Sequence, residues 1–414
     1  MKKTMLATLL LSTINISSAD FMAKIPLEQD KGGGLPDGTI TFTYIAPPPT
    51  PILDCTSLGV SANCDERLNA WVAFADSKTP KLDKNWDNLN WAIKSLTSVP
   101  TELYPLKSPN TINFGNNQLN DLEGFSVLTN PGSLFFSTNN ITNLNGFRNL
   151  ITVNNLILSY NQITTLEGIN NLTSVSNLYL DENDLTDISA LLNITSVNQI
   201  YLYYNNLTNL YGLNNLTNAN ILRFQRNQLT NLDDLNSLTT VNELKLNNNQ
   251  LVNVNGLSNL TSVKNLDLMQ NQLTNISGLI NLVHVNDLNL QSNKLTNLYG
   301  LNNLESSNNL LLNGNDLTNV DELIKLNSVY ELDIQQNKLT NVNGLINLTN
   351  ANFVVLINNP QLNDISGLIN LKASKIAIST SFSGAKLASN TIFCTQNAPS
   401  VFLSGFAQKT QLCQ

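Results

Sequence analysis

Asparagine recurs in this chain at a fixed step of 22 residues, and this feature constrains the fold more than any other. The series runs through Asn117, Asn139, Asn161, Asn183, Asn205, Asn227, Asn249, Asn271, Asn293, Asn315, Asn337 and Asn359. Each stands in the frame L-x-L-x-x-N-x-L, as around Asn249 with Leu244, Leu246 and Leu251. A unit this short cannot bury its apolar face alone, so neighbouring copies must stack. Residues 110–381 are therefore expected to form one solenoid rather than several globular domains.

The spacing inside one unit indicates a strand followed by a tight turn. In the segment x-L-x-L-x, alternation directs the two leucines inward and the flanking residues outward. The asparagine stands where the chain leaves the strand, and its amide can both donate to and accept from backbone groups of the turn. We therefore expect a ladder of buried, structural asparagines whose rungs lie about 4.8 Å apart.

The frame and its period resemble the leucine-rich-repeat family, specifically the short 22-residue class of the bacterial internalins. The first 20 residues of a typical unit are NQLTNISGLINLVHVNDLNL at residues 271–290, and the resemblance covers about two thirds of the chain. It implies a curved horseshoe with a parallel β-sheet on the concave face and turns or 3-10 segments on the convex face. It implies no single function.

The chain begins with a segment typical of a secretory signal peptide. Residues 1–19 contain Lys2 and Lys3, a short apolar run and the small residue Ala19, which predicts cleavage before Asp20. The apolar run is too short to span a bilayer, and no later segment is apolar enough to do so. We therefore expect an exported protein that is secreted, held at the cell surface or periplasmic, without membrane insertion.

The segments outside the repeats are expected to cover the apolar ends of the solenoid. Residues 20–54 form a leader and linker rich in glycine and proline. Residues 55–109 form an N-terminal cap with a helix over 65–76, while the stretch 86–99 fits either a second helix or a degenerate first repeat. Residues 382–414 form a C-terminal cap.

Four cysteines, Cys55, Cys64, Cys394 and Cys413, all lie outside the repeats. In an oxidising compartment an even number of cysteines predicts disulfides, with more than one possible connectivity. Because the stacked repeats separate the first two cysteines from the last two by tens of ångströms, we expect Cys55 to pair with Cys64 and Cys394 with Cys413.

The outward-facing strand positions are the most informative about function, since the repeat frame dictates the residue type at most other positions. Alternation predicts that the side chains at these positions are exposed. Aromatic and apolar residues among them concentrate in one half of the expected sheet, and a basic step follows them. These residues, which we call the patch, are Phe135, Ile157, Tyr160, Tyr179, Tyr201, Tyr203, Tyr204, Arg223, Arg226 and Lys245. Such residues also favour strands in general, but aromatic residues and arginine dominate the energetic centres of interfaces. Their concentration predicts a contact surface for a protein.

Two other binding functions fit parts of the pattern. A carbohydrate binder would stack sugar faces on Tyr179, Tyr201, Tyr203 and Tyr204. An ice-binding or purely structural protein would use the convex lattice of threonine and asparagine, as at Thr230 and Asn231, although capping of turns is the ordinary explanation for these residue types.

Catalysis finds little support in the sequence. His284 is the single histidine and is expected to be a solvated residue on a turn, and no nucleophile set, phosphate-binding loop or metal-ligand cluster is present. The formal net charge of −8 argues against nucleic acid as a partner. We therefore expect a non-enzymatic binding protein without cofactor or metal. It would act as an adhesin or host-interaction factor, and its concave face would recognise a protein of a host or neighbouring cell.

Overall fold

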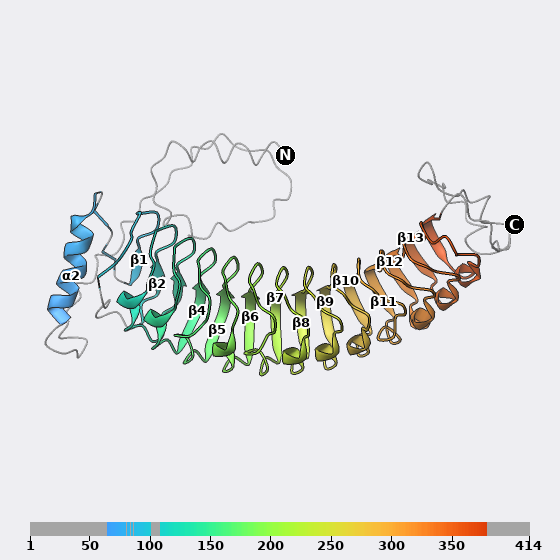
Figure 1. Cartoon of the computed structure of the whole chain (residues 1–414), viewed down its shortest axis with the longest axis horizontal. Coiled ribbons are helices and arrows are strands. Elements are labelled where there is room, and N and C mark those ends of the chain that lie inside the picture. The colour runs from blue at the N-terminus through green and yellow to red at the C-terminus, as the bar shows by residue number, and fades with distance from the viewer. Residues whose placement is uncertain (1–63, 80, 83, 86, 101–107, 379–414) are drawn as a thin grey trace, which may run out of the picture. The chain divides into compact units, whose positions relative to one another are not determined.

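The computed structural model describes residues 64–378 apart from positions 80, 83, 86 and 101–107. All of them belong to one compact unit, Cys55–Gln414. The described residues contain the helix α2 (Cys64–Ser77) and a single sheet of 14 parallel strands that follow one another in chain order (Figure 1). The strands are β1 (Asn88–Asn90), β2 (Thr111–Asn113), β3 (Ser133–Phe135), β4 (Thr152–Ile157), β5 (Ser174–Tyr179), β6 (Ser196–Tyr201), β7 (Asn218–Arg223), β8 (Thr240–Lys245), β9 (Ser262–Asp267), β10 (His284–Asn289), β11 (Ser306–Leu311), β12 (Ser328–Asp333), β13 (Asn350–Val355) and β14 (Lys372–Ala377).

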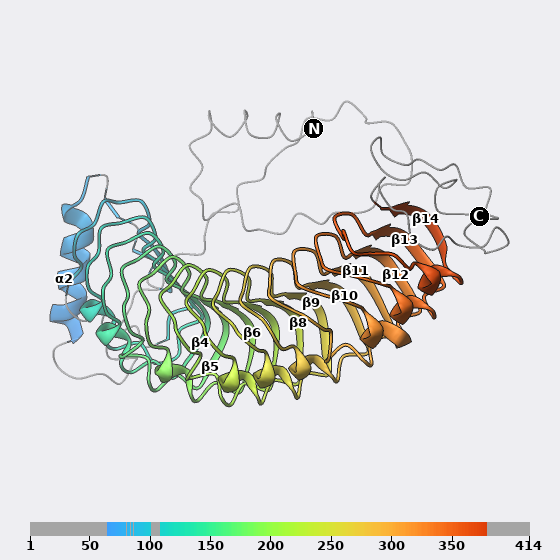
Figure 2. The same cartoon turned by 45° about the vertical axis from the view of Figure 1, so that its right-hand side comes forward.

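Every strand pairs with the equivalent residues of the next unit, as the predicted solenoid requires. Leu222 of β7, for example, lies opposite Leu244 of β8, and Leu244 lies opposite Leu266 of β9. Most turns between strands carry a short 3-10 segment, and these segments follow one another along the outer edge of the stacked turns (Figure 2). They are η2 (Glu123–Phe125), η3 (Asn145–Phe147), η4 (Ser189–Leu191), η5 (Asp233–Leu235), η6 (Asn255–Leu257), η7 (Ser277–Leu279), η8 (Asp321–Lys325), η9 (Asn343–Leu345) and η10 (Ser366–Leu368).

The core consists of apolar columns that run the length of the solenoid. In one unit they are formed by Val241, Leu244, Leu246, Leu251, Val254, Leu257 and Leu260, each exposed by 3% or less. A fully buried side chain of this kind stabilises the fold by about 1.5 to 3 kcal/mol. The burial exists only because the units above and below cover each column, so stability depends on neighbouring units being in place.

The predicted asparagine ladder is confirmed. The twelve asparagines are exposed by only 5–9%. Asn249 shows the arrangement: its Nδ2 donates to the carbonyl oxygens of Leu246 in its own unit (3.0 Å) and Phe224 in the preceding unit (3.1 Å). Its Oδ1 accepts a hydrogen bond from the backbone amide of Leu229 in the preceding unit (3.0 Å). Each asparagine therefore ties two successive turns together.

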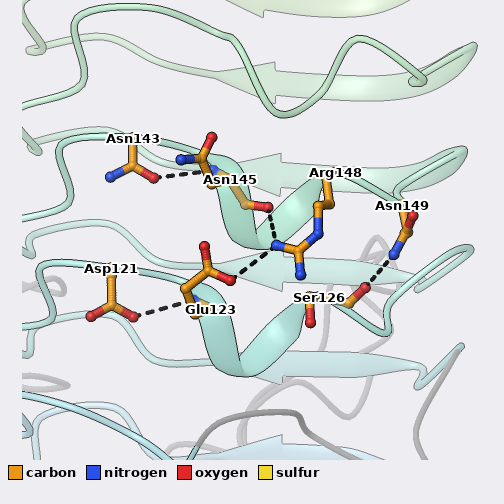
Figure 3. Close-up of polar contacts among 7 residues, drawn as sticks. All are labelled: Asp121, Glu123, Ser126, Asn143, Asn145, Arg148 and Asn149. Atoms are coloured by element: carbon orange, nitrogen blue, oxygen red, sulfur yellow. Dashed lines mark hydrogen bonds and ion pairs between the residues drawn. The ribbon is translucent and has the colours of Figure 1, made fainter.

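A second asparagine ladder lies on the turns, and the sequence analysis missed it. In most units an asparagine stands ten residues after the ladder position, and its side-chain amide donates to a carbonyl of the preceding turn, as at Asn149, Asn171 and Asn259. Asn149 donates to Ser126 over 2.7 Å (Figure 3), and Asn259 donates to Asn236 over 2.7 Å. Several of these asparagines, such as Asn171 and Asn259, begin N-L-T triplets, so the structure gives that motif a role in joining turns.

The asparagines on the convex face cap turns, which is the ordinary explanation given for them in the sequence analysis. The Oδ1 of Asn143 accepts a hydrogen bond from the backbone amide of Asn145 over 3.2 Å, and Asp121 makes the same contact with Glu123 one unit earlier, also over 3.2 Å (Figure 3). Asn231 does the same with Asp233 (3.2 Å). The amide oxygens of this column are therefore engaged with their own turns, which weakens the hypothesis of a lattice that orders water.

Close packing of successive turns explains a recurring glycine. A Cβ added at Gly256 would lie 1.7 Å from the carbonyl oxygen of Leu232 in the preceding turn. One unit before Gly256, Asp234 occupies this position, and the turn that precedes Asp234 changes: Gly212 takes a φ of +124° and the 3-10 segment is absent from that turn. The Asp234 carboxylate then accepts a hydrogen bond from the backbone amide of Leu210 (3.1 Å).

The first unit settles an alternative that the sequence left open. The stretch after α2 forms β1, and Trp91 is fully buried while Ile93 is 76% exposed, so this stretch is a degenerate repeat and not a second helix. Trp71 of α2 is also fully buried, and its ring lies 5.3 Å from that of Trp91 and 6.1 Å from that of Phe125. The helix thus packs on the apolar interior of the first turns.

The predicted disulfides lie outside the described residues, as do the leader 20–54 and the segment 382–414; Cys64 begins α2, but its side chain is not described. The pairs Cys55–Cys64 and Cys394–Cys413 therefore stay predictions. Peptide mapping of the unreduced mature protein is expected to recover both local links. A link between the two ends of the chain, or free thiols, would contradict this assignment.

Candidate functional site

The patch is built on a row of side chains at the carboxyl ends of neighbouring strands. Phe135 pairs with Ile157, Ile157 with Tyr179, and Tyr179 with Tyr201, each in register on the next strand. The same row then continues through Arg223 and Lys245 on β7 and β8. The parallel register therefore brings together, within six adjacent strands, residues that are far apart in the sequence.

The centre of this row is a stack of rings and a guanidinium group. The Tyr179 and Tyr201 rings have centroids 4.4 Å apart and an angle of 4° between their planes. The Arg223 guanidinium lies 4.6 Å from the centroid of Tyr201, an arrangement that is attractive through the ring quadrupole. Because β5 and β7 lie on opposite sides of β6, Tyr179 covers one face of Tyr201 and Arg223 covers the other.

An ion pair fixes the basic end of the row. The Arg223 Nε lies 2.7 Å from Glu243 Oε1, and the Lys245 Nζ lies 3.9 Å from the same oxygen. Glu243 is on β8, two residues before Lys245, so its carboxylate lies between the two cations on the outward face. The arginine is therefore held in place before any partner arrives.

A buried carboxylate that the sequence analysis missed positions Tyr203. Asp181 is 3% exposed, and its Oδ1 accepts a hydrogen bond of 2.7 Å from the Ser159 hydroxyl. Burial raises the pKa of Tyr203 well above its ordinary value of 10.0, and a hydrogen bond to the Asp181 carboxylate raises it further. The signal in the sequence is the succession Ser159, Asp181, Tyr203 at 22-residue steps two positions before the ladder, but alternation alone does not identify it.

Alkaline pH is expected to destabilise the folded protein through Tyr203. Because the pKa of this phenol is higher in the folded state, the unfolded chain loses the proton first as pH rises through 10.0. The contribution of Tyr203 to the free energy of unfolding should therefore be constant below that pH and fall above it. Urea unfolding at several pH values should show a smaller decrease for Tyr203→Phe, and an unchanged slope would contradict the assignment.

The residue immediately before each ladder asparagine forms a second, more exposed column. Tyr160 and Tyr204 in this column are 54% and 42% exposed. The Arg226 guanidinium lies 4.8 Å from the Tyr204 centroid, and the Tyr203 and Tyr204 rings are 5.9 Å apart. The non-glycine residues of the column have a left-handed backbone with φ of 54–58°, a conformation that costs an L-residue roughly 1 to 2 kcal/mol. This backbone turns the column away from the sheet row.

The predicted exposure of the patch needs correction. Tyr160, Tyr204 and Arg226 are exposed, but the sheet row and Tyr203 are half-buried, as seen at Phe135, Ile157, Tyr179, Tyr201, Tyr203, Arg223 and Lys245. The cause is the spacing of about 4.8 Å between strands, which makes aligned side chains cover one another's faces. The row therefore presents ring edges and polar groups to solvent.

Comparison with known proteins identifies the fold. Neither a protein-family model nor a curated protein matches the chain. Among solved structures, an internalin of Listeria monocytogenes is 22% identical, with a TM-score of 0.53 over 78% of this chain and 94% of that chain. A leucine-rich-repeat protein of Leptospira interrogans is also 22% identical, with a TM-score of 0.51 over 77% of this chain and 94% of that one. The chain has the leucine-rich-repeat fold. The resemblance seen in the sequence is thus confirmed for the architecture.

The contacts of the tyrosine rings on this leucine-rich-repeat sheet argue against the glycan hypothesis. Sugar stacking needs a free aromatic face, but both faces of Tyr201 are covered by Tyr179 and Arg223. Tyr204 has Arg226 over its ring and Tyr203 at an edge-to-face angle of 66°. All four proposed stacking tyrosines therefore already contact another ring or a guanidinium within the protein.

Outside the patch, the leucine-rich-repeat solenoid shows few groups suited to chemistry. His284 is exposed, as predicted. It does not lie on a turn, however, because it begins β10 and its backbone pairs with Ser306 of β11. The His284 Nδ1 lies 2.9 Å from the Ser306 hydroxyl.

Within the described ranges, the side chains of His, Cys, Asp and Glu form no group of three or more that would suit a metal ion. No helix in the described part of the chain has the length and apolar character needed to cross a membrane.

Proposed function

We propose that this chain is an exported, non-enzymatic binding protein that captures a protein partner through the patch. The patch lies on the outward side of the sheet, which is the concave side in the leucine-rich-repeat fold. The contact that carries the proposal is the Tyr179–Tyr201–Arg223 stack, whose members lie 4.4 Å and 4.6 Å apart. A stack of this kind is rigid before binding, so little side-chain entropy is lost when a partner covers it.

The polarity of the patch favours a protein over a glycan. Its accessible parts are the edges and hydroxyls of the row, the exposed rings of Tyr160 and Tyr204, and the exposed Arg226. Interfaces between proteins combine aromatic area with such polar and cationic groups. The N-terminal signal sequence supports export, so the partner is expected outside the cytoplasm.

The experiment is affinity capture with the purified mature chain against host-surface and cell-envelope extracts, followed by mass spectrometry. We expect a protein to be retained, and we expect Tyr201→Ala to reduce its retention. A glycan array run in parallel tests the competing function. Strong binding to a defined sugar that is lost in Tyr160→Ala, together with no retained protein, would contradict the proposal.

A further inference from the structure

The left-handed column differs from turn to turn in the residues that occupy it. Every described non-glycine member has a φ of 54–58°, and one member is Gly314 with a φ of +71°. Glycine and asparagine tolerate this conformation best, whereas β-branched and bulky residues tolerate it worst. The non-glycine members are Asn116, Thr138, Tyr160, Glu182, Tyr204, Arg226, Asn248, Gln270, Ser292, Gln336 and Asn358.

The least suited residues are concentrated in five consecutive turns. Thr138, Tyr160, Glu182, Tyr204 and Arg226 follow one another without a glycine or asparagine among them. The turns on either side carry Asn116 and Asn248. In a chain with so much asparagine, the favoured residue is absent from five of the six turns that carry the patch.

Local packing does not require these side chains. At Gly314 an added Cβ would meet no atom nearer than 3.5 Å, so a side chain could be added at this position of the column without a clash. The backbone conformation is the same with glycine, asparagine or tyrosine. The strained residues therefore cost stability without filling the core, which indicates that they serve contacts outside the chain.

The column also contains a positively charged side chain, Arg226, that is available to a partner. Arg223 of the sheet row is paired with Glu243 at 2.7 Å. Arg226, in contrast, is exposed, and its contact within the described residues is the face of Tyr204 at 4.8 Å, with no carboxylate in ion-pair range. A guanidinium that is pre-oriented by a ring and free on its other side suits a carboxylate of a partner.

We propose that the ridge formed by Tyr160, Glu182, Tyr204 and Arg226 docks an extended polypeptide segment that carries an acidic side chain opposite Arg226. The inference rests on the proposed function and names its partner chemistry. The ridge is one side chain wide and spans about 14 Å across four turns, which corresponds to some four or five residues of extended chain. A narrow exposed ridge beside a half-buried row fits a single extended segment of a partner better than a broad partner surface.

The first test separates strain from binding with matched substitutions to asparagine. Tyr204→Asn and Arg226→Asn are compared with Gln270→Asn and Gln336→Asn, which occupy the same column and conformation on the far side of the sheet. All four are expected to raise the thermal midpoint slightly, by about 1 to 3 °C. The probe is a phage-displayed library of random peptides of about twelve residues selected on the full mature chain.

Peptides selected on the natural sequence are expected to be rich in aspartate and glutamate. Their affinity should fall about tenfold or more in Tyr204→Asn and Arg226→Asn, and by less than about twofold in the two far-side variants. Selection on Arg226→Glu should instead enrich lysine and arginine. Failure to select any peptide, or peptides that bind all four asparagine variants equally, would overturn the inference. Loss of binding in Tyr201→Ala with none in the ridge variants would overturn it while leaving the proposed function standing.

Discussion

Replacing Asn227 with alanine is expected to lower the free energy of unfolding by about 1 to 3 kcal/mol, the largest loss of stability among the substitutions considered. Asn227 is 8% exposed, and its Nδ2 donates to the carbonyls of Leu202 (2.9 Å) and Phe224 (3.1 Å). Its Oδ1 accepts from the amide of Leu207 (3.0 Å). Alanine leaves the buried Leu207 amide without a partner. Each carbonyl loses one of its two side-chain donors, since Leu202 keeps Asn205 and Phe224 keeps Asn249. A buried group left without a partner costs about 1 to 3 kcal/mol.

Asn231→Ala is the matched control, because it removes an asparagine from the same unit. Asn231 accepts one hydrogen bond, from the exposed amide of Asp233 at 3.2 Å, which water can replace. Its loss should cost about 0.5 kcal/mol. Urea unfolding of both variants provides the comparison. Equal midpoints would show that burial of the ladder does not determine its contribution.

Tyr201→Ala is expected to weaken binding of the captured partner by about 2 kcal/mol or more, which is a loss of roughly thirtyfold in affinity. The substitution removes the middle member of the Tyr179–Tyr201–Arg223 stack. It therefore removes contact area and also frees Tyr179 and Arg223 to move, so preorganisation is lost together with the contact. Tyr203→Ala should have a comparable effect, since Tyr203 lies 6.2 Å from Tyr201 and contacts Tyr204.

The far half of the same sheet supplies the controls for these two variants. Asn289 and Gln335 are half-buried at outward positions near the ends of β10 and β12. Alanine there should change affinity by less than about 0.5 kcal/mol. The dissociation constant of the purified partner, with circular dichroism as a check on folding, is the measurement. If the far-half variants lost binding and the tyrosine variants kept it, the contact surface would lie elsewhere on the sheet.

The limits of the sequence are clearest at the patch. Alternation placed Tyr179 and Tyr201 correctly on the outward side, but it described them as exposed when they are half-buried. A residue's own strand decides the direction of its side chain, whereas the neighbours at 22-residue steps decide what remains accessible. The sequence analysis missed the role of Asp181 for the same reason, because its partners Ser159 and Tyr203 belong to the units before and after it.

The sequence by itself determined the period, the strand positions, the apolar columns and the asparagine ladder. These features follow from alternation within one unit and from its repetition, so local rules suffice. Only the tertiary structure decided which faces of Tyr201 are free, how the turn before Asp234 adapts, and where Ile93 lies. Each of these depends on atoms that a neighbouring turn brings within a few ångströms, and such distances are set by packing between units rather than by the order of residues within one.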